Sequence, residues 1–249
     1  MTETLPTEGW AVLRQAVIAT ADHDATSSRL REGLGLEPGF ADPLLADIGL
    51  RDETLRIGSE SHLEVVAPLT DDHPLRRWLA KVGGTAGYCL SVQVPDVQVL
   101  LDSAAAAGVR VLFDERHFDR RIVQLHPGDM GVIVELDEIP ERDVWFWDDV
   151  DAVEPASPLV GDVLGVEIAT PDPAALAQRW TEVLGAVLAD DQSAYDDGAA
   201  RVWLGTRRVR FVEGPQTVMR AVELAASEHA DGAPSVVDLD GVELRINRP

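Results

Sequence analysis

Gln15-Ala-Val-Ile-Ala-Thr-Ala-Asp22 is the first of three similar segments, followed by Cys89-Leu-Ser-Val-Gln-Val-Pro-Asp96 and Gly165-Val-Glu-Ile-Ala-Thr-Pro-Asp172. Each alternates, or nearly alternates, small and β-branched residues, which is typical of a half-buried strand. Each ends in Asp, whose carboxylate can accept hydrogen bonds from the free backbone N–H groups that begin a helix. The sequence therefore predicts three strands that each lead into a helix.

A helix and then short strands are predicted after each of these segments. The helices span residues 25–32, 97–107 and 173–184, and glycine follows each of them, as expected at a helix end. The strands span 53–57 and 61–67, then 110–113, 120–126 and 131–136, then 200–204 and 208–212. The capping aspartates are 96 − 22 = 74 and 172 − 96 = 76 residues apart. Such a regular spacing indicates an internal repeat.

A shortened fourth copy is predicted at the end of the chain. It has a strand over 220–226, a remnant of the helix over 228–232, and a hairpin over 235–246 that turns at Asp240-Gly241, because Asp-Gly favours a two-residue hairpin. The fold class is therefore α+β, with four βαβββ modules paired into two domains, 1–139 and 159–249. The linker, 140–158, contains Trp145 and Trp147, which either pack on one domain or form a lid over a substrate.

Composition narrows the classes of protein. The 249 residues include 44 acidic and 21 basic side chains, so the formal net charge is −23. An acidic surface of this kind repels phosphate backbones and anionic lipids, so neither nucleic acid nor membrane is expected as a partner. The single cysteine excludes an internal disulfide, and the acidic, polar N-terminus does not match a secretory signal, so a cytoplasmic location is expected.

The paired strand–helix–strand units resemble the vicinal oxygen chelate superfamily, which includes glyoxalase I, methylmalonyl-CoA epimerase, extradiol dioxygenases and bleomycin-resistance proteins. The resemblance covers nearly the whole chain and is strongest over residues 10–139. Residues 125–136, Leu-His-Pro-Gly-Asp-Met-Gly-Val-Ile-Val-Glu-Leu, look much like the closing strand of the epimerase and glyoxalase branch. Because this fold carries many chemistries, the resemblance predicts a fold better than it predicts a function.

The resemblance implies a cavity in which four strands each contribute one ligand to a divalent metal. Matched by position in the repeat, the ligands fall on Gln15, Glu64, Cys89 and Glu135. Side chains alternate along a strand, so these four are expected to face one concavity. The metal would be Zn²⁺, Ni²⁺, Mn²⁺ or Mg²⁺, or the site would be metal-free.

Three of these residues have two interpretations. Cys89 departs from the histidine more often found in the family, and it is either a zinc-favouring thiolate or a small buried core residue. The aliphatic neighbours of Glu64 suggest burial. Burying Glu64 and Glu135 together requires a cation, a shared proton or arginine partners, so they are either a functional pair or satisfied by surface arginines.

Histidine and arginine supply two further candidates. His126, ahead of a Pro-Gly turn, is either a cavity acid/base or a hydrogen-bonded turn residue. The basic cluster around His117, with Arg116, Arg120 and Arg121, either receives an anionic substrate tail or forms a solvated hairpin face.

The second half does not reproduce the ligand set. The equivalent positions are assigned to Gly165, Phe211 and Arg245, which cannot replace the first-half ligands, so a ring-cleaving extradiol dioxygenase is not expected. The second half is expected to be a scaffold, an apolar wall or the contact surface of a homodimer.

The sequence is compatible with two functions. One is a metal-assisted isomerase, epimerase or lyase that acts on a small carbonyl compound in the first-half cavity, with Glu64, Glu135 and His126 as catalytic residues. The alternative is a metal-free protein that sequesters a small molecule in the manner of bleomycin-resistance proteins.

Overall fold

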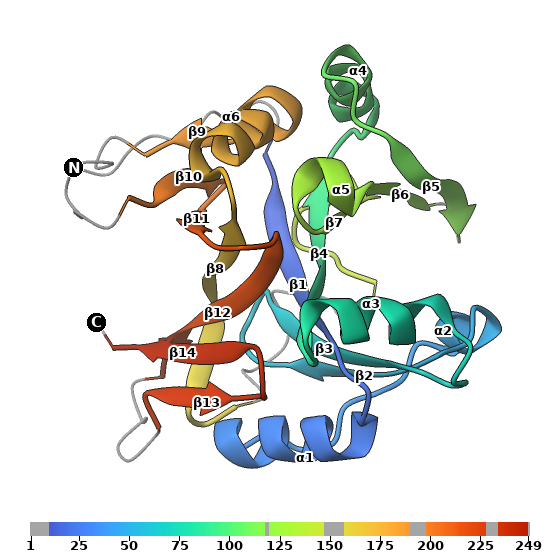
Figure 1. Ribbon diagram of the computed structural model, residues 1–249, viewed down its shortest axis with the longest axis vertical. Helices are drawn as coiled ribbons and strands as arrows, with labels where there is room; N and C mark the ends of the chain where they lie inside the picture. The colour runs from blue at the N-terminus through green and yellow to red at the C-terminus, as the bar shows by residue number, and fades with distance from the viewer. Residues whose placement is uncertain (1–9, 118–119, 147–156, 190–197, 228–233, 249) are drawn as a thin grey trace.

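The computed structural model describes residues 10–117, 120–146, 157–189, 198–227 and 234–248. Its elements follow the predicted repeat (Figure 1). The first unit comprises β1 (Val12–Ala19), α1 (His23–Leu34), α2 (Pro43–Asp47), β2 (Leu50–Arg56) and β3 (His62–Pro68). After α3 (Pro74–Val82), the second comprises β4 (Ala86–Val94), α4 (Gln98–Ala106), β5 (Val111–His117), β6 (Arg120–Leu125), α5 (Pro127–Met130) and β7 (Ile133–Glu138).

The second half of the chain repeats the arrangement. Its third unit comprises β8 (Val160–Thr170), α6 (Pro173–Leu184), β9 (Val187–Leu188), β10 (Ala200–Leu204) and β11 (Arg207–Glu213). The last unit comprises β12 (Val218–Ala226), β13 (Val236–Asp238) and β14 (Glu243–Asn247). The predicted helix remnant over 228–232 lies outside the described residues. The α+β class and the repeated strand–helix–strand units are confirmed, as the resemblance to the vicinal oxygen chelate fold implies.

The strands pair in the same way in both halves. In the first half, β1 pairs antiparallel with β4, and each pairs in parallel with the last strand of its own unit, β3 or β7. In the second half, β8 pairs antiparallel with β12, and each pairs in parallel with β11 or β14. A single pairing between β4 and β12 joins the halves into one 14-stranded sheet.

In two of the three repeats, the predicted aspartate caps the start of the helix. Asp22 and Asp172 accept the backbone N–H of the residue three positions later, at 3.1 and 3.0 Å, and cap α1 and α6. Asp96 was predicted to cap α4 in the same way, but α4 begins one residue later, with Val97 at its N-cap. Asp96 instead accepts from the backbone N–H of Gln98, at 2.8 Å.

Helix α3 was not predicted from the sequence. Pro74 lies in its first turn and Gly83 ends it at φ 97°, both strong boundary signals. Leu75 and Leu79 are buried, and they pack on the face of the sheet formed by β1, β3, β4 and β7. Figure 1 shows α3 lying across these strands. This helix covers part of the face that carries the candidate site.

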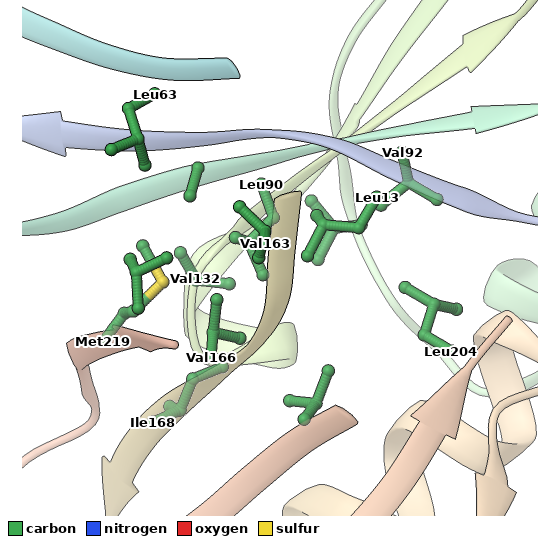
Figure 2. Close-up of a cluster of buried hydrophobic side chains, with 14 of the residues drawn as sticks. Leu13, Leu63, Leu90, Val92, Val132, Val163, Val166, Ile168, Leu204 and Met219 are labelled. Atoms are coloured by element: carbon green, nitrogen blue, oxygen red, sulfur yellow. The ribbon is translucent and has the colours of Figure 1, made fainter. Parts of the chain in front are cut away.

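One continuous apolar core underlies both halves. Its residues come from the face of each half-sheet that α1 and α6 cover (Figure 2). First-half residues such as Leu13 and Leu90 lie in the same cluster as Val166 and Ile168 of β8. Trp180 of α6 adds a polar link, because its indole N–H donates to the Met130 carbonyl at 2.9 Å. None of the described helices is long and apolar enough to cross a membrane.

The linker residues that the structure describes pack on the first half. Trp145 is 3% exposed and packs against Ile139. The centroid of its ring lies 5.8 Å from the guanidinium carbon of Arg14. This contact matches the packing interpretation of Trp145. Trp147 and most of the predicted linker lie outside the described residues, so the boundaries 1–139, 140–158 and 159–249 stay a prediction.

Candidate functional site

The strand registers bring polar residues onto one face of the first half-sheet. Gln15 lies opposite Ser91 on β4, and Glu135 of β7 lies opposite the same serine. Val17 lies opposite both Glu64 on β3 and Cys89 on β4. Paired residues point to the same side of a sheet, and side chains alternate along each strand. All four residues assigned as ligands therefore share the face opposite the apolar core.

Glu64 is a buried carboxyl group of this face with a raised pKa. It is 8% exposed and accepts a hydrogen bond from the Gln15 side-chain amide at 3.0 Å. Burial raises its pKa well above 4.5, and the negative charges of Asp52, Glu135 and Asp42 raise it further, against the lowering effect of the Gln15 hydrogen bond. Glu64 therefore holds a proton at a pH at which an ordinary glutamate is ionised.

Glu135 has different partners. Its carboxylate accepts from the Ser91 hydroxyl at 2.8 Å and from the Gln124 amide at 2.6 Å. Ser91 and Gln124 lie on the strands on either side of β7 and were not singled out from the sequence. Ser91 was recognisable in principle, because it lies two residues after Cys89 on the same strand.

Cys89 is a buried thiol. Burial raises its pKa well above 9.0, and the nearby charges of Glu135, Glu64 and Asp137 raise it further. The neutral thiol packs with Val17 and Ile133 beneath α3. This environment matches the interpretation of Cys89 as a buried core residue.

Asp137 is a buried carboxyl group that was not predicted from the sequence. It lies two residues after Glu135 on β7, so it points to the same face, and it is fully buried. Among the described residues, neither of its carboxylate oxygens has a hydrogen-bond partner. Burial and the charge of Glu135 raise its pKa well above 3.8. A neutral carboxylic acid is the form that such a place favours.

Two β-bulges in the β1–β4 pair place further side chains at this face. The register shifts between Leu13 and Gln15 on β1, and between Cys89 and Gly87 on β4, so Arg14 and Tyr88 are the extra residues. Tyr88 packs against Trp78 of α3, with ring centroids 5.4 Å apart. Burial raises the pKa of Tyr88 to about 12, with smaller effects from Cys89 and Glu135, so its hydroxyl keeps its proton.

The side chains as arranged do not fit a divalent metal. Among the described residues, no three His, Cys, Asp or Glu side chains gather in a way that could hold a metal ion. The Gln15 amide donates to Glu64, and both Glu135 oxygens already accept hydrogen bonds. Coordination by Glu64 and Cys89 would have to displace the protons that burial holds on both groups. The metal and its ligand set stay a prediction from the resemblance.

His126 lies at the N-cap of α5. Its Nδ1 atom accepts the Gly128 backbone N–H at 2.9 Å. This matches the turn interpretation of His126. In the basic cluster, Arg121 forms two 2.8 Å hydrogen bonds to Asp114, and Arg120 pairs with Glu141 at 3.1 Å. Acidic partners therefore accompany this hairpin, as its interpretation as a solvated face implies.

The registers correct one assignment in the second half. Val17 and Glu167 each lie five residues before a capping aspartate, and they lie opposite Glu64 and Arg210 respectively. The position equivalent to Glu64 is therefore Arg210, and not Phe211. Phe211 belongs to the apolar core and packs edge-on against Trp180, with ring centroids 5.6 Å apart.

Comparisons with known proteins support the fold and do not establish the function. A scan against protein families and a search of curated proteins each found no match. Among solved structures, a hypothetical protein from Staphylococcus aureus is similar over 96% of this chain and 99% of its own, with a TM-score of 0.66 and 10% identity. This whole-length likeness shows the fold alone.

Two further solved structures are similar to about half of the chain. One is methylmalonyl-CoA epimerase from Streptomyces coelicolor, a variant in complex with 2-nitronate-propionyl-CoA, at 30% identity over 50% of this chain and 94% of that one, with a TM-score of 0.43. The other is methylmalonyl-CoA epimerase from Mycobacterium tuberculosis, at 27% identity over 54% and 92%, with a TM-score of 0.45.

Proposed function

We propose that this chain is a vicinal oxygen chelate protein whose first half moves a proton on a small carbonyl compound, as an epimerase or isomerase does. The observation that carries the proposal is Glu64, a buried carboxyl group with a raised pKa on a polar sheet face, with a second carboxylate, Glu135, near enough to affect it. Strongly shifted carboxyl groups of this kind are typical of acid–base sites.

The chemistry follows from the groups on this face. In its ionised form Glu64 would take the proton from the carbon next to the carbonyl, because a base with a raised pKa competes better for that proton. The Gln15 amide holds the Glu64 carboxyl group in place. Tyr88 keeps its hydroxyl proton and can donate to the oxygen on which negative charge develops. Helix α3 would limit the access of water.

A divalent cation would polarise the carbonyl oxygen if one were bound. No step of the proposal depends on it, because the donor arrangement does not fit. The roles predicted for Cys89 as a ligand and for His126 as an acid or base stay separate predictions, as does a homodimer.

Proton exchange tests the proposal. Candidate compounds are hemithioacetals of 2-oxoaldehydes, 2-substituted malonyl thioesters and 2-oxo acids. Each is incubated with the protein in heavy water, and the C–H signal next to the carbonyl is followed by NMR. We expect exchange with at least one class, and a rate lower by about 100-fold or more in Glu64→Gln, because acid–base groups contribute about that much. The control is Glu115→Gln, at an exposed position on β5.

Metal-free sequestration is the second candidate, favoured by the neutral thiol and the amide donor at positions assigned to ligands. It predicts compounds that raise the melting temperature in proportion to their affinity without any proton exchange. That result, or equal exchange rates for the native chain and Glu64→Gln, would replace the proton-transfer proposal.

A further inference from the structure

The loop between β2 and β3 is held by the second half of the chain. Asp162 of β8 accepts from the Ser59 hydroxyl at 2.9 Å and from the Glu60 backbone N–H at 2.7 Å. The Val163 backbone N–H donates to the hydroxyl oxygen of Ser61, a fully buried residue, at 3.2 Å. These hydrogen bonds tie the first-half loop to the start of β8.

Close packing leaves the loop little freedom to move. A Cβ atom added to Gly58 would lie 2.1 Å from Oδ1 and 2.6 Å from the backbone nitrogen of Asp162, so only glycine fits at this position. The Ile57 backbone N–H donates to the Ser61 carbonyl at 3.1 Å, and both residues are fully buried. A change at Asp162 is therefore felt by the whole loop.

The same loop is bonded to the strand that carries Gln15. The Glu60 carbonyl accepts from the guanidinium group of Arg14 at 3.2 Å, and Arg14 is fully buried and directly precedes Gln15 on β1. The Glu60 carboxylate accepts from Arg207 of β11 at 3.0 Å and from Arg142 at 3.1 Å. Glu60 therefore joins the first half, the second half and the segment that follows β7.

Both partners of the hydrogen bond at the candidate site adjoin these contacts. Ser61 directly precedes β3, and Glu64 follows it by three residues. Gln15 follows Arg14 on β1. The Gln15 amide donates to Glu64 at 3.0 Å, and a hydrogen bond weakens steeply when its partners are misaligned. The placement of Glu64 against Gln15 therefore depends on how the loop holds β3 beside β1.

We propose that Asp162 is a positioning residue for the first-half site. Its carboxylate holds the loop that leads into β3, and the loop keeps Glu64 aligned with the Gln15 amide. The second half thereby supports the proton-transfer site, while Asp162 itself takes no part in proton transfer. This inference rests on the proposed function for its catalytic meaning, but the hydrogen bond between Gln15 and Glu64 can be followed without a substrate.

NMR of the Gln15 side-chain amide in the full-length, nitrogen-labelled protein tests the proposal. Its signal is assigned by its absence in Gln15→Leu, and Glu64→Ala gives its position without the hydrogen bond. We expect Asp162→Ala to shift the signal toward that position. Asp162→Asn should shift it less, because asparagine keeps one carbonyl oxygen that can accept from the loop.

Asp172→Ala is the matched control. Asp172 also accepts a backbone N–H, from Ala175 at 3.0 Å, but it caps α6 rather than holding the loop. We expect the Gln15 signal of this variant to match that of the native chain. For a compound that undergoes proton exchange, Asp162→Ala should lower kcat by up to about 100-fold with KM nearly unchanged, because a misplacement of about 1 Å costs that much.

A native Gln15 signal in Asp162→Ala would overturn the proposal. Equal shifts in Asp162→Ala and Asp172→Ala would also overturn it, because both would then reflect general loosening. If Asp162→Ala does not fold, Ser59→Ala removes one loop hydrogen bond at an exposed position. A smaller shift in the same direction supports the positioning role, and a native signal contradicts it. An absence of exchange with every compound would count against the proposed function alone, since the NMR shifts decide the role of Asp162.

Discussion

Glu64 and Asp137 are carboxyl groups that the fold buries on one sheet face without a cationic partner among the described residues. Glu64 has the Gln15 amide, whereas Asp137 has no hydrogen-bond partner in that part of the structure. Burial is the largest cause of the raised pKa in both. The protonated state costs less than a buried charge, so each side chain is available to donate or accept a proton.

The raised pKa of Asp137 makes the stability of the protein depend on pH. Between the ordinary value, 3.8, and the higher folded value, the folded chain binds more protons than the unfolded chain. The free energy of unfolding contributed by this group therefore falls as pH rises, by up to about 1.4 kcal/mol per pH unit. It is fully present below the unfolded pKa and is lost as pH rises through the folded pKa.

Asp137→Asn should remove this contribution. We expect the free energy of unfolding of the variant, relative to that of the native chain, to increase as pH rises above 3.8, because only the native chain loses stability there. Urea denaturation at each pH measures the difference, with Asp47→Asn at an exposed position as the control. A difference between Asp137→Asn and the native chain that stays constant with pH would contradict the raised pKa.

Only some residues of the candidate site are predictable from the sequence. Gln15, Glu64, Cys89 and Glu135 could be placed because they fall at fixed positions in a repeat. Asp137 and Tyr88 could not, because their importance comes from burial and from a register shift of one residue. Both depend on tertiary packing, which no local pattern records.

At the scale of elements, α3 determines how the candidate site meets solvent. Leu75 and Leu79 dock on the sheet near Cys89 and Ile133, and Trp78 packs against Tyr88. The helix was predictable from Pro74 and Gly83 at its ends and from its apolar spacing. The repeat does not predict α3, because this helix lies between the first two units.

Loosening α3 should expose the thiol beneath it. Leu79 is 3% exposed, so Leu79→Ala removes buried apolar contacts and should lower the free energy of unfolding by about 2–5 kcal/mol. The variant should react faster with a thiol reagent than the native chain, whose single cysteine is buried and holds its proton. Absorbance on addition of a disulfide reagent gives the rate.

Val99→Ala on α4 is the matched control, because Val99 is 63% exposed. Equal thiol reaction rates in Leu79→Ala and Val99→Ala would show that α3 does not shield Cys89.

For the whole molecule, the close approach of β4 and β12 is the feature that joins the halves. Gly87 lies opposite Met219, and a Cβ atom added to Gly87 would lie 2.5 Å from the Met219 Cβ. Apolar residues of both halves form one core on the adjoining face. The repeat predicted two similar halves, but nothing in its spacing indicated that their sheets join or that they share a core.

Gly87→Ala should therefore destabilise the protein by about 1–3 kcal/mol, because overpacking forces the strands apart. Gly161→Ala on β8 is the matched control, since its added Cβ would lie 3.5 Å from the Ala225 Cβ, an ordinary contact. Thermal or urea unfolding gives both values. Equal stability of the two variants would contradict the close joining of the halves.

The titration of Glu64 tests most directly the claim that the first-half face is an acid–base site. NMR of labelled glutamate carboxyl carbons gives its pKa, with the Glu64 signal assigned by its absence in Glu64→Gln. We expect a midpoint well above 4.5 that falls in Glu135→Gln, because that change removes a nearby negative charge. A midpoint at or below 4.5 would contradict the account.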